Sequence, residues 1–119
     1  MNEMKLGAVE SRFADVIWQN EPISSSELAK LALAQLEWKK STTYTILKRL
    51  CDRGIFVNNG GTVTSLLSKE QFYAVQSEKF VEETFSGSLP AFVAAFSSRK
   101  KLSDDEINQL QKMIDKMRG

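Results

Sequence analysis

The chain has 119 residues, which is enough for one small domain with an extension but too few for two ordinary hydrophobic cores. Sixteen basic and fifteen acidic side chains leave a net charge of +1, so a nucleic-acid surface would need a local concentration of positive charge. The absence of histidine and the single cysteine exclude a disulfide framework and a Cys/His zinc site. They also remove the commonest general base. We therefore expect no enzyme, no cofactor and no metal site.

Three amphipathic segments are predicted to be helices. Residues 6–20 place apolar side chains at helical spacing, and a Glu-Pro pair then interrupts the pattern. Ser24 and Glu27 form a capping-box pattern that predicts the start of a second helix. A third helix is predicted over residues 39–53, ending at Gly54, which can adopt the left-handed conformation of a helix cap. The short link before it favours a helix-turn-helix.

A β-hairpin is predicted directly after the third helix. Residues 55–57 and 62–66 are rich in β-branched and aromatic side chains, and they flank the Asn-Asn-Gly-Gly sequence at 58–61, a strong hairpin signal. A hairpin after a helix-turn-helix is typical of a winged helix. This wing carries no charged residue, so we expect Asn58 and Asn59 to contact DNA through hydrogen bonds.

The third predicted helix has two chemically different faces. One side carries apolar residues, whereas the opposite side carries hydroxyls and cations. Residues 39–53 hold five cations against one carboxylate, so this run is much more basic than the chain as a whole. Hydroxyls can reach base edges while Lys and Arg neutralise phosphates, although periodicity alone also fits a solvent-exposed amphipathic helix. The residues expected to contact DNA are Lys39, Lys40, Ser41, Thr42, Tyr44, Thr45, Lys48, Arg49, Asn58 and Asn59.

Residues 69–119 are expected to form helices outside a winged domain of residues 1–68. We predict a helix up to Phe85, a short apolar helix over residues 89–96, and a last amphipathic helix capped by Ser103. These helices carry more apolar surface than so short an extension can bury, so we expect a homodimer, with packing onto the winged domain as the alternative. The residues expected in the dimer interface are Phe80, Phe85, Leu89, Phe92, Val93, Phe96, Ile107, Leu110 and Ile114.

The sequence gives no sign of membrane insertion or export. No apolar run approaches the roughly 18 residues that a membrane-spanning helix needs, and the N-terminus lacks a signal-peptide pattern. We therefore expect a cytoplasmic protein. Cys51 is expected to be a reduced, partly buried thiol.

Three groups of residues occur in a recognisable order: Val16-Ile17-Trp18, then Pro22-Ile23-Ser24 with Glu27-Leu28, then Thr42 to Leu50 followed by Gly54-Ile55. In this order, and in the spacing to the C-terminal helices, the chain resembles the penicillinase-repressor family of bacterial transcriptional repressors. The resemblance implies a dimer held by the C-terminal helices, whose winged domains bind a double-stranded operator with an inverted repeat centred on TACA and TGTA.

The resemblance also assigns base reading to four residues of the third helix, namely Ser41, Thr42, Tyr44 and Thr45. Tyr44 departs from the family, because many relatives carry Arg or Lys at this position. A tyrosine can contact a thymine methyl group, so the preferred operator is expected to shift toward apolar readout.

Two modes of induction occur among such repressors. Copper-responsive members carry a C-terminal cysteine cluster, whereas this chain has no cysteine after Cys51, so direct copper sensing is not expected. Members that respond to β-lactams are cut within the short apolar helix, which implies a membrane-bound sensor protease as a second partner. The matching bond here joins Ala95 and Phe96, with Ala95 in place of the Asn of relatives.

One alternative function belongs to a different class. The neutral wing and near-zero net charge favour a winged-helix protein-interaction module that binds a partner through Phe92, Phe96 and their apolar neighbours without contacting DNA. The concentration of cations and hydroxyls on one helix face argues against it, because a protein partner would not require them.

Overall fold

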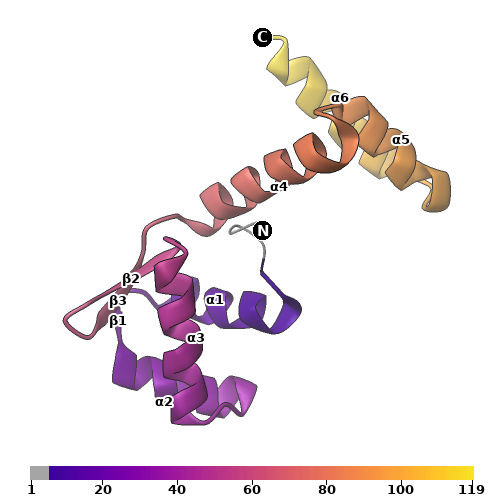
Figure 1. Ribbon diagram of the computed structural model, residues 1–119. Coiled ribbons are helices and arrows are strands. Elements are labelled where there is room, and N and C mark those ends of the chain that lie inside the picture. The colour runs from indigo at the N-terminus through magenta and orange to yellow at the C-terminus, as the bar shows by residue number, and fades with distance from the viewer. Residues whose placement is uncertain (1–5) are drawn as a thin grey trace. The chain divides into compact units, whose positions relative to one another are not determined.

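The computed structural model describes residues 6–119. Over this range the chain forms six helices and three short strands (Figure 1). Their bounds are α1 Ala8–Asn20, β1 Ile23–Ser24, α2 Ser25–Leu36, α3 Lys40–Asp52, β2 Phe56–Asn59, β3 Thr62–Ser65, α4 Lys69–Phe85, α5 Leu89–Arg99 and α6 Asp104–Met117. The expected fold class, a winged helix-turn-helix followed by C-terminal helices, is confirmed. By its internal contacts the chain divides within α4 into two units, the first ending at Ser77.

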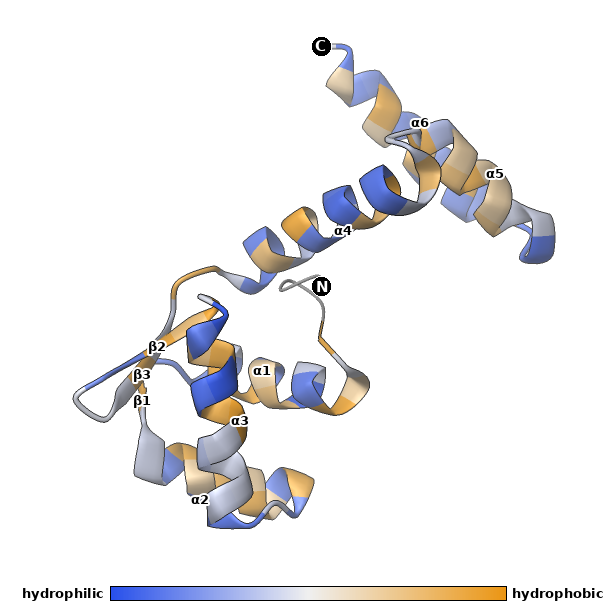
Figure 2. Cartoon of the chain, viewed as in Figure 1, coloured by the Kyte–Doolittle hydropathy of each residue, from blue (hydrophilic) through white to orange (hydrophobic). Residues whose placement is uncertain are grey.

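The first unit packs three helices against a small sheet. Its core contains Phe13 and Ile17 from α1, Leu28 from α2, and Leu47 and Leu50 from α3, all of them buried. These residues recur every three or four positions, so each helix turns one apolar face inward. Figure 2 shows the polar side of α3 on its other face. Burial of the apolar faces therefore fixes which side of α3 meets solvent.

The sheet has three antiparallel strands in the order β1-β3-β2. The hairpin closes through Gly60 and Gly61, whose φ angles of 60° and 92° require residues that tolerate the left-handed region. The side-chain oxygen Oδ1 of Asn58 accepts a hydrogen bond of 3.0 Å from the backbone N–H of Gly61, which fixes this turn. Strand β1 was not predicted. It pairs Ile23 with Val63 and thereby joins the end of α1 to the hairpin.

The helix-turn-helix geometry depends on how α2 and α3 begin and end. Ser24 Oγ accepts from the backbone N–H of Glu27 at 3.1 Å, while the Glu27 carboxylate pairs with Lys30, so only the first half of the predicted capping box forms. Helix α2 ends at Leu36, and its C-cap residue Glu37 is left-handed, with φ of 59°, although it is not glycine. At the far end of α3, Gly54 has the expected left-handed conformation, with φ of 80°.

The first turns of α4 pack into the core of the first unit. The indole N–H of Trp18 donates to the carbonyl oxygen of Leu67 at 3.0 Å, and Lys69 Nζ lies 2.9 Å from Asp15 Oδ1. This ion pair raises the pKa of Lys69. Phe72 is fully buried. The contacts thus carry the first unit beyond residue 68, where the sequence places the boundary, because Phe72 completes the core.

The second unit contains the end of α4 together with α5 and α6. A turn with φ of 50° at Ser86 and 82° at Gly87 separates α4 from α5. Helix α5 continues to Arg99, beyond its predicted end at Phe96. Ser103 and Glu106 form the capping box of α6, and these hydrogen bonds lower the pKa of Glu106. None of the residues described from 78 to 119 is buried, so a single copy of this unit has no core.

No helix among the described residues is both long and apolar enough to cross a membrane.

Candidate nucleic-acid interface

The outward face of α3 carries most of the residues expected to contact DNA. Ser41, Thr42, Thr45 and Lys48 are exposed, whereas Thr43 is fully buried on the opposite side. The two lysines at the start of the helix, Lys39 and Lys40, are exposed as well. The core-facing residues therefore hold α3 so that its hydroxyls and cations face outward, as a helix that reads the major groove requires.

Tyr44 is held at the edge of this face by its neighbours. Its ring lies 5.9 Å from Lys40 Nζ, within the range of a cation–π contact. Tyr44, Lys48 and Asn58 also line one open hollow of about 310 Å³ between α3 and β2, together with Leu47 and Cys51. The structure thus brings together a predicted wing residue and two predicted residues of α3.

The hydroxyl and ammonium groups of α3 remain available for hydrogen bonds and ion pairs with DNA. Thr45 Oγ1 donates to the carbonyl oxygen of Ser41 at 2.9 Å, which orients the hydroxyl and leaves its lone pairs free to accept a hydrogen bond. Lys48 Nζ lies 3.5 Å from Asp52 Oδ2, but both side chains are exposed. Such an exposed pair contributes little stability, so a phosphate can displace Asp52 from Lys48.

Arg49 lies differently from the other predicted contacts. Its Nη1 atom is 3.8 Å from Glu10 Oε2, so its guanidinium is drawn toward α1. Glu10 was not singled out in the sequence, where it reads as an ordinary acidic residue in the first turn of a helix. The pairing joins residues far apart in the chain, and only the packing of α1 against α3 brings them together.

The wing places its two asparagines at the tip of the hairpin. Both Asn58 and Asn59 are exposed. The Oδ1 atom of Asn58 holds the turn, as described above, so the side-chain amide N–H groups are what this residue can offer to DNA. The wing therefore contributes hydrogen-bond donors without charge.

Cys51 lines the same hollow as Tyr44. Burial raises the pKa of the Cys51 thiol, the carboxylate of Asp52 raises it further, and a hydrogen bond from the backbone of Asn58 lowers it. The neutral thiol is therefore favoured near pH 7. Cys51 is partly buried, as the sequence predicts.

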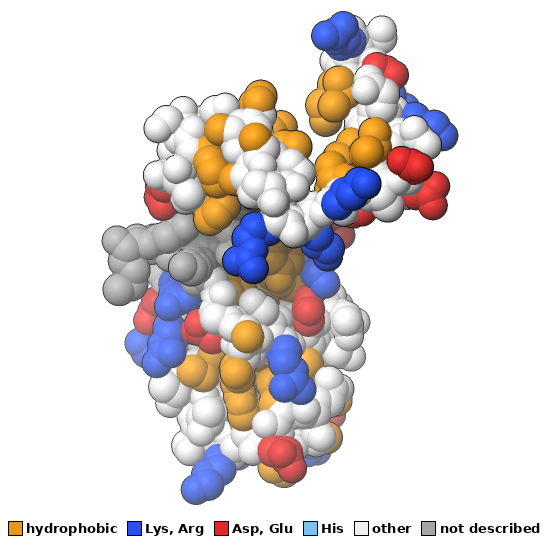
Figure 3. Space-filling view, turned by 90° about the vertical axis from the view of Figure 1, so that its right-hand side faces the viewer, with side chains coloured by type: hydrophobic (Ala, Val, Ile, Leu, Met, Phe, Trp, Pro, Cys, Tyr) orange, Lys and Arg blue, Asp and Glu red, His pale blue; other side chains and the backbone are white. Residues whose placement is uncertain are grey.

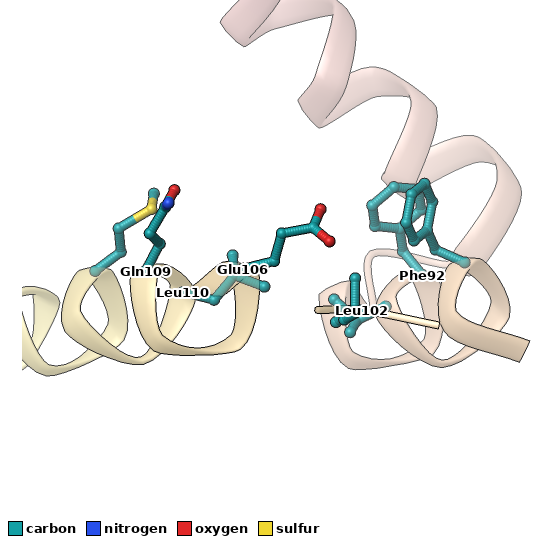
Figure 4. A pocket seen from close by; sticks show the side chains of 8 residues that line it. Phe92, Leu102, Glu106, Gln109 and Leu110 are labelled. Atoms are coloured by element: carbon teal, nitrogen blue, oxygen red, sulfur yellow. The ribbon is translucent and has the colours of Figure 1, made fainter. Parts of the chain in front are cut away.

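Most of the C-terminal residues expected at a dimer interface are exposed. Figure 3 shows apolar side chains at the surface of the second unit. Between α5 and α6 lies an open pocket of about 310 Å³, lined mainly by apolar side chains (Figure 4). Phe92 faces it from α5, and Leu110 faces it from α6. The exposed members of the predicted set are Phe80, Leu89, Val93, Phe96, Ile107, Leu110 and Ile114, while Phe85 and Phe92 are half-buried.

Comparison with known proteins decides the family. A family model described as penicillinase repressor matches residues 6–116. The chain belongs to the penicillinase repressor family. The resemblance inferred from the sequence is therefore confirmed, and penicillinase repressors are bacterial DNA-binding transcriptional regulators without enzymatic activity.

Individual relatives cover nearly the whole chain. A penicillinase repressor of Bacillus licheniformis is 26% identical over 115 residues, which is 93% of this chain and 90% of the relative. A methicillin resistance regulatory protein MecI of Staphylococcus aureus is 23% identical over 116 residues, or 94% of each chain. The corresponding MecI of Mammaliicoccus sciuri is 22% identical over 116 residues. Membership in the penicillinase repressor family thus extends through the C-terminal helices.

Proposed function

We propose that this chain represses transcription as a homodimer that binds an inverted repeat centred on TACA and TGTA. The observation that carries the proposal is the outward face of α3, where hydroxyls and lysines are exposed on a winged helix of the penicillinase repressor family. Occupation of such a site would block a promoter sterically. A repressor that binds an operator on bacterial DNA would work in the cytoplasm.

The second unit supports the homodimer. It buries none of its residues, yet α5 and α6 carry many exposed apolar side chains. A surface of this kind usually marks an interface. A second copy is the natural partner, because a symmetric dimer presents two α3 helices to the two halves of an inverted repeat.

Fluorescence anisotropy provides the direct test. A duplex with the TACA/TGTA repeat and a scrambled duplex would each be titrated at several salt concentrations, with the protein concentration spanning dimer formation. We expect tight, salt-dependent binding that favours the repeat. Equal binding to both duplexes would reject the operator sequence. No binding at any salt concentration would reject the DNA role and favour the protein-interaction module.

Two substitutions on α3 separate phosphate contacts from base reading. Lys48→Ala should weaken binding to every duplex and reduce the slope of log K against log salt by about 0.9 per chain bound, because one phosphate contact is lost. Thr45→Val replaces the hydroxyl with a methyl group of similar size. It should change the preference among operator variants at every salt concentration. If both variants bind every operator like the native chain, α3 does not read DNA.

Proteolytic relief of repression is the third part of the proposal. Ala95 and Phe96 lie inside α5, and the carbonyl oxygen of Ala95 accepts a hydrogen bond of 2.7 Å from the Ser98 hydroxyl. A protease must therefore unwind this part of α5 before it can cut the bond. Loss of the residues after the cut would remove α6 from the dimer and weaken operator binding.

The residue at position 95 allows a matched test of cleavage. We expect Ala95→Asn, which restores the residue of β-lactam-responsive relatives, to increase cutting by an active sensor protease, whereas Ala94→Asn should not. Mass spectrometry would detect the fragment that ends at residue 95. A chain that stays intact in all three forms would contradict this mode of induction.

A further inference from the structure

One carboxylate joins the basic end of α3 to α1. Glu10 Oε2 lies 3.8 Å from Nη1 of Arg49 and 3.8 Å from Nη1 of Arg53. The other oxygen, Oε1, accepts a hydrogen bond of 3.2 Å from the backbone N–H of Gly7 at the start of α1. The Glu10 side chain is only 20% exposed. It is thus fixed in place between the two helices.

Glu10 Oε2 attracts the two arginines by charge but forms no hydrogen bond with them. A separation of 3.8 Å is too long for a hydrogen bond, and Glu10 Oε2 is a buried atom without a hydrogen-bond partner among the described residues. A DNA phosphate can offer a guanidinium shorter, charge-assisted hydrogen bonds. Phosphate is therefore a better partner than Glu10 for any arginine that can reach it.

The two arginines differ in how far they reach solvent. The side chain of Arg49 is 51% exposed, whereas that of Arg53 is 25% exposed. Arg49 lies one turn after Thr45, so its side chain belongs to the exposed part of α3. Arg49 can therefore exchange Glu10 for a phosphate, while Arg53 stays beside the carboxylate.

We propose that Glu10 is a positioning residue that competes with DNA phosphate for Arg49 and thereby lowers the affinity of α3 for DNA. The proposal rests on the proposed function, because it assumes that α3 lies on DNA. Of the five cations between residues 39 and 53, Arg49 can then contact a phosphate only when it leaves Glu10. Because phosphate contacts carry no sequence information, Glu10 restrains binding to all duplexes alike.

The test is Glu10→Gln, which keeps an oxygen for the N–H of Gly7 but removes the charge. We expect it to bind any duplex about two- to fivefold more tightly at low salt, the range for release of one partly exposed ion pair. The slope of log K against log salt should steepen by up to about 0.9 per chain bound. In an Arg49→Gln background the same substitution should change neither quantity.

Each contrary result has a distinct meaning. An equal gain with and without Arg49 would show a general field effect and overturn the proposal. An unchanged salt slope would also overturn it. The same holds if Glu27→Gln, which removes a carboxylate paired with Lys30 on α2, raises the affinity for DNA as much as Glu10→Gln does. Native binding with an unchanged Glu10→Gln variant would reject this proposal alone. Failure of the native chain to bind DNA would reject the proposed function as well.

Discussion

Replacing Leu110 with glutamate is expected to turn the proposed dimer into monomers and to weaken binding to the proposed inverted repeat by at least about a hundredfold. Leu110 lines the apolar pocket between α5 and α6 and remains 40% exposed in a single chain. In a symmetric dimer the substitution would bury two carboxylates in an apolar interface, and each costs several kcal/mol unless it is paired. A factor of ten in binding corresponds to about 1.4 kcal/mol.

A matched variant separates the interface from a general charge effect. Asn108→Glu adds the same charge to α6, two residues away and therefore on the opposite side of the helix. It should leave the dimer and operator binding unchanged. Analytical ultracentrifugation would measure the oligomeric state, and anisotropy would measure binding to one half-site and to the full repeat. A Leu110→Glu variant that stays dimeric would show that α6 does not form the interface.

If dimerisation is lost, the two DNA probes should respond differently. A monomer still presents one α3, so its affinity for a half-site should match that of the native chain. Its advantage for the full repeat should vanish, because the two recognition helices are no longer linked. Loss of binding to both probes would instead indicate that the substitution disturbed the winged unit.

Most of the winged fold could be predicted from local patterns. Apolar spacing of three and four marks α1, α2 and α3, and two consecutive glycines mark the hairpin turn. Strand β1 was missed because its two residues are too few for an alternating pattern. The left-handed Glu37 was also missed, since only Gly and Asn normally signal that conformation. Tertiary packing decides both features.

The end of α5 shows how side chains extend a helix beyond its apolar pattern. The apolar run ends at Phe96, yet the helix continues through two serines that usually favour turns. The Ser97 hydroxyl donates to the carbonyl oxygen of Val93 at 2.8 Å, and the Ser98 hydroxyl donates to that of Ala95. These hydroxyls bond within the helix instead of terminating it.

The candidate site was predictable where it depends on one helix and unpredictable where it depends on two. Exposure of Thr45 and Lys48 follows from the periodicity of α3 alone. The ion pair between Glu10 and Arg49 depends on how α1 crosses α3, which no local pattern encodes. The same reason explains Phe72, which sequence reasoning assigns to a separate helix although it fills the winged core.

The second large effect is expected from Phe72→Ala. Phe72 is fully buried, and its ring lies 5.8 Å from that of Trp18 and 5.2 Å from that of Tyr73. Removing a buried phenylalanine leaves a cavity and typically lowers the free energy of unfolding by about 3–5 kcal/mol. Because marginal domains have only about 5–15 kcal/mol, the first unit should approach unfolding at physiological temperature.

Val75→Ala provides the comparison, because Val75 lies on the same helix, within the first unit, but is 39% exposed. Val75→Ala should lower the free energy of unfolding by well under half as much as Phe72→Ala, since the smaller side chain is already partly exposed to water. Urea unfolding followed by tryptophan fluorescence would measure both variants, because Trp18 packs against Phe72 and reports directly on this part of the core. Equal costs would mean that α4 does not belong to the winged core. A large cost for Phe72→Ala, with the second unit unaffected, would instead place the structural boundary inside α4. One continuous helix would then carry both the last core residue of the first unit and the first aromatic residues of the second unit.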